Sequence, residues 1–189
     1  MLKDYKLNWA LGNNIHTEDP KEQIIYQLIE ETANDSNSSK FREDITKWMV
    51  GLETSQAKLG YDDDFIPIEV KPKNFTGKAK LDGGGQFNDF TWKRAEKYNQ
   101  DKVIMLVSGF FYGKLVFVIE FGYESIRPKI ETHLTRLLPN GDEINRYVRS
   151  ANFSYKDWKE SNFVVKYKSP NIAEYKHAIV GKLYDLLTK

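Results

Sequence analysis

The stretch GYDDDFIPIEVKPKN, residues 60–74, combines a run of three aspartates with an alternation of apolar and charged residues. From residue 66 onward the apolar side chains occupy every second position, which predicts a strand over residues 66–73 with one apolar face. The opposite face carries Glu69, Lys71 and Lys73. Because Pro72 has no N–H for a strand ladder, the regular strand is expected to fade just past Lys71.

Residues 57–62 form a second predicted strand, and the two strands make a tight hairpin. Six residues separate Asp62 from Glu69, so a hairpin centred between residues 65 and 66 sets the two carboxylates directly opposite each other. Directly paired residues have β-carbons about 4.5–5.5 Å apart, and two like charges at that distance repel. A divalent cation removes this repulsion, and oxygen ligands suit Mg²⁺ or Mn²⁺ better than a soft metal.

Lys71 completes the group of charged residues on this hairpin. It lies two residues beyond Glu69 and therefore emerges on the same face, about 6.5–7 Å along the strand. Its ammonium would orient a metal-bound water and neutralise charge that develops on a phosphate. Asp63 is the alternative to Asp62, because a change of one residue in the turn would exchange their faces.

Two amphipathic helices are predicted upstream of the hairpin, and their apolar stripes are expected to lie in the core. The first covers residues 20–31, with Pro20 near its start. Its stripe consists of Ile24, Ile25, Leu28 and Ile29. The second ends at Gly51, and its stripe consists of Phe41, Ile45, Trp48 and Met49.

Downstream of the hairpin, helices and strands alternate. A glycine-rich polar loop over residues 74–89 precedes a helix over residues 90–98, with Asn88 or Asp89 as its cap. Two apolar strands, 102–110 and 114–121, meet in a turn at residues 112–113 and are expected to be central in the sheet. The later elements are a helix over 125–138, a turn at 139–141, a short helix over 142–149, strands over 153–155 and 163–167, and a last helix over 172–187. Helices that flank a short mixed sheet predict one α/β or α+β domain.

Composition excludes several kinds of site. Without cysteine there is no disulfide, thiolate zinc site or cysteine nucleophile, and three scattered histidines lack the spacing of a zinc site. The most apolar stretches are strand-sized and the N-terminus lacks a signal-peptide pattern, so we expect a cytoplasmic protein without a membrane span. Residues 1–64 carry 7 Lys or Arg against 13 Asp or Glu, whereas residues 65–189 carry 21 against 14. The second part would therefore attract a polyanion.

The hairpin resembles a known catalytic signature. A Gly-Tyr-Asp at residues 60–62, followed across a short turn by Glu-Val-Lys at residues 69–71 after the aliphatic Ile68, is similar to the PD-(D/E)XK nuclease motif. That superfamily includes most type II restriction endonucleases. Tyr61 stands where the motif has a proline, which is often lost in the family. The order of elements over residues 20–121 also resembles compact restriction enzymes, and implies a restriction-endonuclease-like mixed sheet with flanking helices.

The resemblance also implies roles for individual residues. Asp62 and Glu69 would hold Mg²⁺, for which Mn²⁺ can substitute, with the Val70 carbonyl as an extra ligand. Lys71 would act on the nucleophilic water. In such nucleases auxiliary acids often come from the preceding helix or the start of the strand. Two residues are candidates for this role: Glu31 and Glu53.

Polar residues on and after the catalytic strand are candidates for binding DNA. Lysines beside a phosphodiester fit contacts to the backbone, and Gln or Asn side chains pair with adenine edges. The candidates are Lys73, Asn74, Lys78, Lys80, Gln86 and Asn88. The three glycines at residues 83–85 either permit close approach of the backbone to DNA or form a mobile surface loop.

These observations predict a magnesium-dependent endonuclease of double-stranded DNA, with a single nuclease domain over residues 1–189 and a catalytic core over about residues 20–121. A type II restriction endonuclease is the favoured subtype. A two-fold homodimer would suit a symmetric site, because each chain has one catalytic cluster. The alternatives are a repair, recombination or phage nuclease of the same superfamily, and a non-catalytic DNA- or protein-binding module with a nuclease-like fold.

Overall fold

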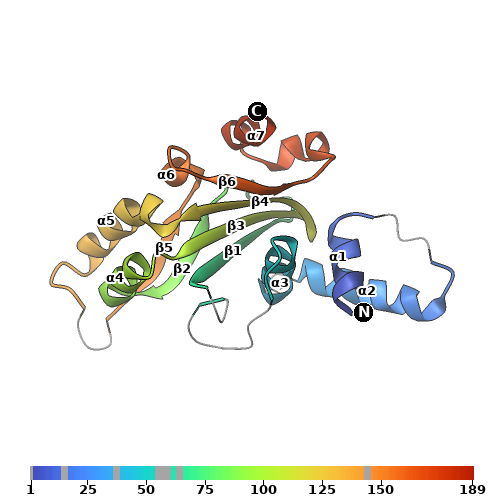
Figure 1. Ribbon diagram of the computed structural model, residues 1–189, viewed down its shortest axis with the longest axis horizontal. Coiled ribbons are helices and arrows are strands. Elements are labelled where there is room, and N and C mark those ends of the chain that lie inside the picture. The colour runs from blue at the N-terminus through green and yellow to red at the C-terminus, as the bar shows by residue number, and fades with distance from the viewer. Residues whose placement is uncertain (1, 14–16, 36–38, 54–60, 63–65, 143–145) are drawn as a thin grey trace.

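A four-stranded mixed sheet forms the centre of the computed structural model, which describes residues 2–13, 17–35, 39–53, 61–62, 66–142 and 146–189 (Figure 1). The strand order is β1-β3-β4-β6, formed by Ile68–Phe75, Ile104–Phe111, Lys114–Gly122 and Val164–Lys168. β1 runs parallel to β3, and the other neighbouring pairs are antiparallel. The domain is α+β, as predicted, and the apolar strands β3 and β4 are indeed central.

Both faces of this sheet are covered, which explains why its central strands are apolar throughout. One face packs against α1 (Leu2–Ala10), α2 (Pro20–Asn34) and α3 (Ser39–Met49). The other packs against α4 (Trp92–Gln100), α5 (Arg127–Leu137), α7 (Gly181–Thr188) and a two-stranded sheet of β2 (Gly85–Phe90) and β5 (Val148–Phe153). Figure 1 shows α1 and α2 at one end of the molecule and α4 and α5 at the other. Within the described ranges every helix is too short or too polar to cross a bilayer.

The upstream helices confirm the sequence prediction, with one correction to the first stripe. α2 and α3 begin and end close to the expected residues. On α2, however, Ile24 is 58% exposed and Leu28 57% exposed, while Ile29 and Ala33 are buried. The prediction that all four isoleucines and leucines of this stripe lie in the core was therefore wrong. The helix presents a narrower face, rotated toward Ala33, to its neighbours α1 and α3.

β1 is shifted relative to the predicted strand over residues 66–73, because it begins at Ile68 and continues through Pro72 to Phe75. The Ile104 amide donates to the Pro67 carbonyl at 2.8 Å, so odd-numbered residues of β1 direct their backbone groups at β3. The nitrogen of Pro72 consequently faces the open edge, where no ladder hydrogen bond is lost. The expectation that the strand fades after Lys71 failed because β1 is an edge strand.

The predicted polar loop over residues 74–89 ends in a strand. β2 covers Gly85–Phe90 and pairs antiparallel with β5, which starts where a short helix over residues 142–149 was expected. Five inward side chains bury this ribbon against the main sheet and helices: Phe87, Phe90, Val148, Ala151 and Phe153. The helix prediction was wrong for the described residues 146–149, and residues 143–145 lie outside the described part of the chain.

The glycines at residues 83–85 allow the chain to pack closely against the β2–β5 ribbon and its neighbours. A β-carbon on Gly84 would lie 2.1 Å from the Phe153 carbonyl oxygen, and one on Gly83 would lie 2.8 Å from the Trp158 ring. Both glycines are buried, and Gly83 has a positive φ of 60°. Gly83 and Gly84 therefore lie close to other parts of the protein itself. The two interpretations offered by the sequence, close approach of the backbone to DNA and a mobile surface loop, do not apply to these two residues.

Other differences concern the ends of elements. Thr91, rather than Asn88 or Asp89, caps α4, because its hydroxyl accepts from the Arg94 amide at 3.2 Å. The strand expected over residues 153–155 is the end of β5 followed by a short helix, α6 (Tyr155–Trp158).

The predicted last helix is broken into a 3₁₀ helix, η2 (Ile172–Ala178), and α7, because residues 178–180 bond to the Leu81 backbone in a parallel bridge. A 3₁₀ turn, η1 (Tyr123–Ser125), precedes α5, and the β3–β4 hairpin, α5 and β6 follow the prediction.

Candidate functional site

β1 positions Glu69 and Lys71 by alternation. Ile68 and Val70 are 3% and 2% exposed and pack on the side of α1–α3, which directs Glu69 and Lys71 to the opposite face. There the Lys71 ammonium lies 5.0 Å from the centroid of the Phe87 ring on β2. Asp62, Glu69 and Lys71 are called the acid–lysine cluster below.

Glu69 is a buried carboxylate, 5% exposed, and its partners compensate its charge. Its Oε1 is paired with the Lys71 ammonium and lies 3.7 Å from Nη2 of Arg94. Its Oε2 accepts a hydrogen bond from the Tyr98 hydroxyl. A buried carboxylate with two cations and a phenol around it is held in one orientation.

α4 contributes two residues to this arrangement that the sequence did not single out. The Tyr98 hydroxyl accepts hydrogen bonds from Arg94 Nε at 3.1 Å and Nη2 at 2.7 Å while it donates to Glu69. Burial, and then the nearby charge of Glu69, raise the pKa of Tyr98, so the phenol remains a donor. In sequence, Tyr98 fits the apolar face of a helix and gave no signal of a polar role.

Asp62 lies beside β1 on its open edge. Its amide donates to the Ile68 carbonyl at 2.9 Å, and its Oδ2 accepts from the Val70 amide at 2.6 Å. The buried ammonium of Lys47 on α3 donates to the Asp62 carbonyl. Burial raises the pKa of Asp62, and the charge of Glu69 raises it further. Asp62 therefore lies near Glu69, and the two carboxylates repel each other. The Asp62 amide bonds to Ile68 and Asp62 lies in a bend, so the direct Asp62–Glu69 pairing of the predicted hairpin is not formed.

The rest of the predicted hairpin is only partly described. The regular strand begins at Ile68 rather than residue 66, and Asp62 lies in a bend. Residues 57–60, with the Gly60 of the motif, and residues 63–65, with the alternative Asp63, lie outside the described residues. The Tyr61 ring packs against Tyr98 with ring centroids 5.8 Å apart, and the Tyr61 hydroxyl donates to the Asp101 carboxylate after α4. These two contacts hold Tyr61, the residue before Asp62, in place.

Glu43 on α3, an acid that the sequence did not single out, interacts with Asp62. Glu31 contacts Gln27 at 3.4 Å on α2, and Glu53 pairs with Lys3 at 3.4 Å. Glu43 on α3 lies closer to the cluster: burial raises its pKa first, and the charge of Asp62 raises it next. Glu43 stands within the predicted second helix, but only the packing of α3 on β1 distinguishes it from the other acids there.

The donor set fits a hard divalent cation. Among the described residues no group of three or more His, Asp or Glu side chains is close enough to enclose a metal ion. Mg²⁺ does not need such a cage, since it keeps several waters and binds through one or two carboxylates. Asp62 and Glu69 supply two carboxylates that repel each other, and alternation along β1 directs the Val70 carbonyl to the same open edge as Asp62. These three residues would hold the ion.

The predicted DNA-binding residues divide into two groups. Lys73 pairs with Asp82 at 2.9 Å, and Asn74 accepts from the Gly113 amide at 3.0 Å, which secures the β3–β4 turn. The second group faces solvent: Lys78 and Lys80 on the loop after β1, and Gln86 and Asn88 on β2. Asn74 therefore has a structural partner, whereas the exposed group is accessible to a ligand.

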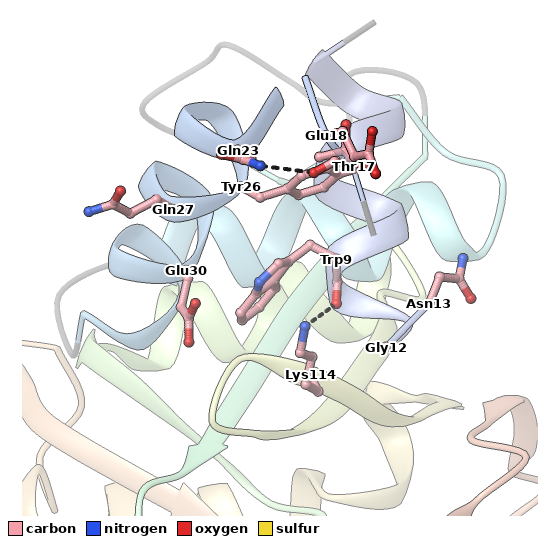
Figure 2. Close-up of a pocket in the computed structure, with 10 residues that line it drawn as sticks. All are labelled: Trp9, Gly12, Asn13, Thr17, Glu18, Gln23, Tyr26, Gln27, Glu30 and Lys114. Atoms are coloured by element: carbon pink, nitrogen blue, oxygen red, sulfur yellow. Dashed lines mark hydrogen bonds between the residues drawn. The ribbon is translucent and has the colours of Figure 1, made fainter. Parts of the chain in front are cut away.

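A wide cleft of about 970 Å³ lies apart from the acid–lysine cluster, between α1, α2 and the start of β4 (Figure 2). Lys114 reaches into it, donates to the Trp9 carbonyl at 2.6 Å and lies 3.5 Å from the Trp9 ring centroid. Burial lowers the pKa of Lys114 to about 8. Glu18 and Glu30 also line the cleft, so its charge does not favour a phosphate.

For the nuclease predicted from the sequence, Tyr98→Phe is expected to reduce DNA cleavage by roughly tenfold to a hundredfold and to raise the Mg²⁺ concentration that gives half-maximal rate. Loss of one hydrogen bond to a charged group costs about 1.5–3 kcal/mol where the partner stays buried, and here Glu69 would lose its orientation. Cleavage rates over a Mg²⁺ titration measure the effect. Tyr123→Phe is the matched control, because its buried hydroxyl has no hydrogen-bond partner in the described residues. Equal Mg²⁺ dependence in both variants would contradict a positioning role for Tyr98.

The cluster joins Asp62, Glu69 and Lys71 on the edge of the main sheet, with Tyr98 and Arg94 behind Glu69. No protein-family model matches the chain, and no curated protein is significantly similar to it in sequence.

Proposed function

We propose that this protein is a magnesium-dependent DNA endonuclease that hydrolyses phosphodiester bonds at the acid–lysine cluster. The observation that carries the proposal is the placement of two repelling carboxylates, Asp62 and Glu69, beside a lysine that is bound to one of them. A solvent-facing hairpin would have no reason to bury Glu69 or to bond the Asp62 carboxylate to the Val70 amide.

Each residue has a distinct role in this proposal. Asp62, Glu69 and the Val70 carbonyl would hold Mg²⁺, which would supply Lewis-acid activation of water and neutralise charge on the phosphate. Lys71 donates hydrogen bonds to the attacking water and to the phosphate oxygens, where negative charge grows as the P–O bond to the leaving group breaks. Tyr98 and Arg94 keep Glu69 oriented, so the reacting groups need little rearrangement.

The finer assignment to a restriction-endonuclease-like fold is part of the same proposal. The order of the Glu-x-Lys strand β1, the following loop, helix α4 and the strand pair β3–β4 supports it. A restriction enzyme that cuts both strands of a symmetric site would act as a homodimer, since each chain contributes one cluster. The excess of Lys and Arg after residue 64 supports double-stranded DNA as the substrate.

Incubation with plasmid DNA tests the proposal. Purified protein is expected to cut with Mg²⁺ or Mn²⁺ and to be inactive with EDTA or with Ca²⁺ alone. Discrete bands indicate a sequence-specific enzyme, whereas smearing or nicking indicates a repair, recombination or phage nuclease. Absence of cleavage on plasmid, single-stranded DNA and RNA would reject a nuclease and leave the non-catalytic binding module.

A further inference from the structure

The outer face of the β2–β5 ribbon carries uncharged polar side chains in two cross-strand pairs. Two cross-strand pairs face outward, Gln86 with Asn152 and Asn88 with Ser150. All four are uncharged amides or hydroxyls, and all but the partly buried Ser150 are exposed. Amides and hydroxyls can each donate and accept, so this face presents a two-by-two array of hydrogen-bonding groups.

The inner face makes the array rigid. The Phe87 ring packs at a tilt against those of Phe90 and Phe153, with ring centroids 4.7 and 5.8 Å apart. Along each strand the outer side chains also bond to each other: Gln86 Nε2 donates to Asn88 Oδ1 at 2.6 Å, and Asn152 Nδ2 donates to Ser150 Oγ at 3.3 Å. Each amide retains donor and acceptor capacity after one such bond. The array is therefore held in place before any ligand arrives.

The array lies near the acid–lysine cluster, because the start of β2 packs against Lys71. β2 begins at Gly85, where a β-carbon would lie 2.7 Å from the Lys71 β-carbon, and Gln86 is the next residue. A cleft of about 370 Å³ joins Lys73 to Gln86 and Asn152. The outer face of the ribbon therefore borders a cleft that reaches Lys73, two residues along β1 from Lys71.

A second hollow continues along the ribbon beyond this cleft. It measures about 570 Å³ and is lined by Gln86, Asn88, Asp89, Tyr147, Arg149 and Ser150. Arg149 is suited to guanine and Gln or Asn to adenine, while the carboxylate of Asp89 accepts from the cytosine amino group and repels phosphates. This mixture fits base edges better than the DNA backbone.

We propose that the β2–β5 ribbon lies in the major groove of double-stranded DNA and reads base edges through Gln86, Asn88, Ser150 and Asn152. The proposal rests on the proposed nuclease function, which places DNA at Lys71. The major groove admits a two-stranded ribbon. Outward residues two apart on a strand are separated by about 6.5–7 Å, and stacked bases of one DNA strand by about 3.4 Å, so the array covers about two base-pair steps.

Gln86→Ala and Asn152→Ala test this proposal, with Gln27→Ala on α2 as a matched exposed-amide control. Randomised duplex DNA is selected for binding in Ca²⁺ and, in a parallel experiment, cleaved in Mg²⁺, and both pools are sequenced. The ribbon variants are expected to lose discrimination at one or two adjacent base pairs by roughly tenfold to a hundredfold. Gln27→Ala, which lies outside the cluster and the ribbon, is expected to select the wild-type sequence and to cleave it as the wild type does.

The outcomes separate the two proposals. Ribbon variants that keep the wild-type motif, or a wild-type protein that cleaves without sequence preference, would overturn the reading role of the ribbon and leave the nuclease intact. A wild-type protein that selects a motif through Gln86 and Asn152 but never cleaves would overturn the nuclease and retain the ribbon. A protein that neither selects nor cleaves DNA would overturn both.

Discussion

Asp62→Asn is expected to lower the rate of DNA cleavage by several orders of magnitude without unfolding the protein. A metal ion held by one carboxylate is weakly bound and poorly aimed at the phosphate. The asparagine amide oxygen can still accept from the Val70 amide, which now donates to Asp62 at 2.6 Å. Since burial and Glu69 already disfavour the charged form of Asp62, the neutral side chain should not lower the free energy of unfolding. Single-turnover cleavage and thermal unfolding measure the two effects.

Asp63→Asn and Asp64→Asn are the comparisons for this variant. Asp64→Asn is expected to be close to neutral, and Asp63→Asn to affect cleavage less than Asp62→Asn does. Full activity in Asp62→Asn together with an inactive Asp63→Asn would move the metal-binding role to Asp63 and change the turn by one residue.

Gly84→Ala is expected to destabilise the fold by about 3 kcal/mol or more, the upper end of the cost of overpacking. The added β-carbon would lie 2.1 Å from the Phe153 carbonyl oxygen and 2.9 Å from the Ser154 α-carbon. Both contacts are with backbone, so relief requires β5 to move away from β2. Urea unfolding followed by tryptophan fluorescence measures the loss.

Gly181→Ala provides the control for this substitution. Gly181 starts α7, has no positive φ, and its β-carbon would meet no atom within 4 Å. Alanine there is expected to leave stability unchanged or raise it by up to about 1 kcal/mol. Similar stabilities for Gly84→Ala and Gly181→Ala would contradict the close packing of the glycine triplet.

Elements with a local signal were predictable from the sequence. The alternation at residues 68–71 identified β1 and separated Glu69 and Lys71 from the apolar face, and the β3–β4 hairpin followed from two apolar runs around a turn at residues 112–113. These patterns suffice because each depends on residues close together in the chain.

The β2–β5 ribbon could not be predicted in the same way. Its strands pair residues 85–90 with residues 148–153, about sixty positions apart, and the sequence of β2 is rich in glycine, asparagine and aspartate, which usually indicate turns. The strand forms because Phe87 and Phe90 find a buried partner surface on β5 and α4. Non-local burial therefore overrides the local preference.

The residues that support the cluster were missed for a related reason. Lys47 and Glu43 belong to α3, and Tyr98 and Arg94 to α4, so only the packing of these helices against β1 brings them to Asp62 and Glu69. A helical pattern identifies which side of a helix is buried, but it does not identify the strand residue that each side chain meets.

The most direct test of the account compares wild-type protein with Lys71→Ala on plasmid DNA in Mg²⁺. The proposal assigns Lys71 to the reacting phosphate rather than to the duplex as a whole, so its loss is expected to abolish cleavage while DNA affinity measured in EDTA stays within a few-fold. Lys78→Ala and Lys80→Ala, by contrast, are expected to weaken binding and reduce its salt dependence by about one unit of slope for each lost phosphate contact. Cleavage by Lys71→Ala at the wild-type rate would contradict the acid–lysine cluster as the catalytic centre.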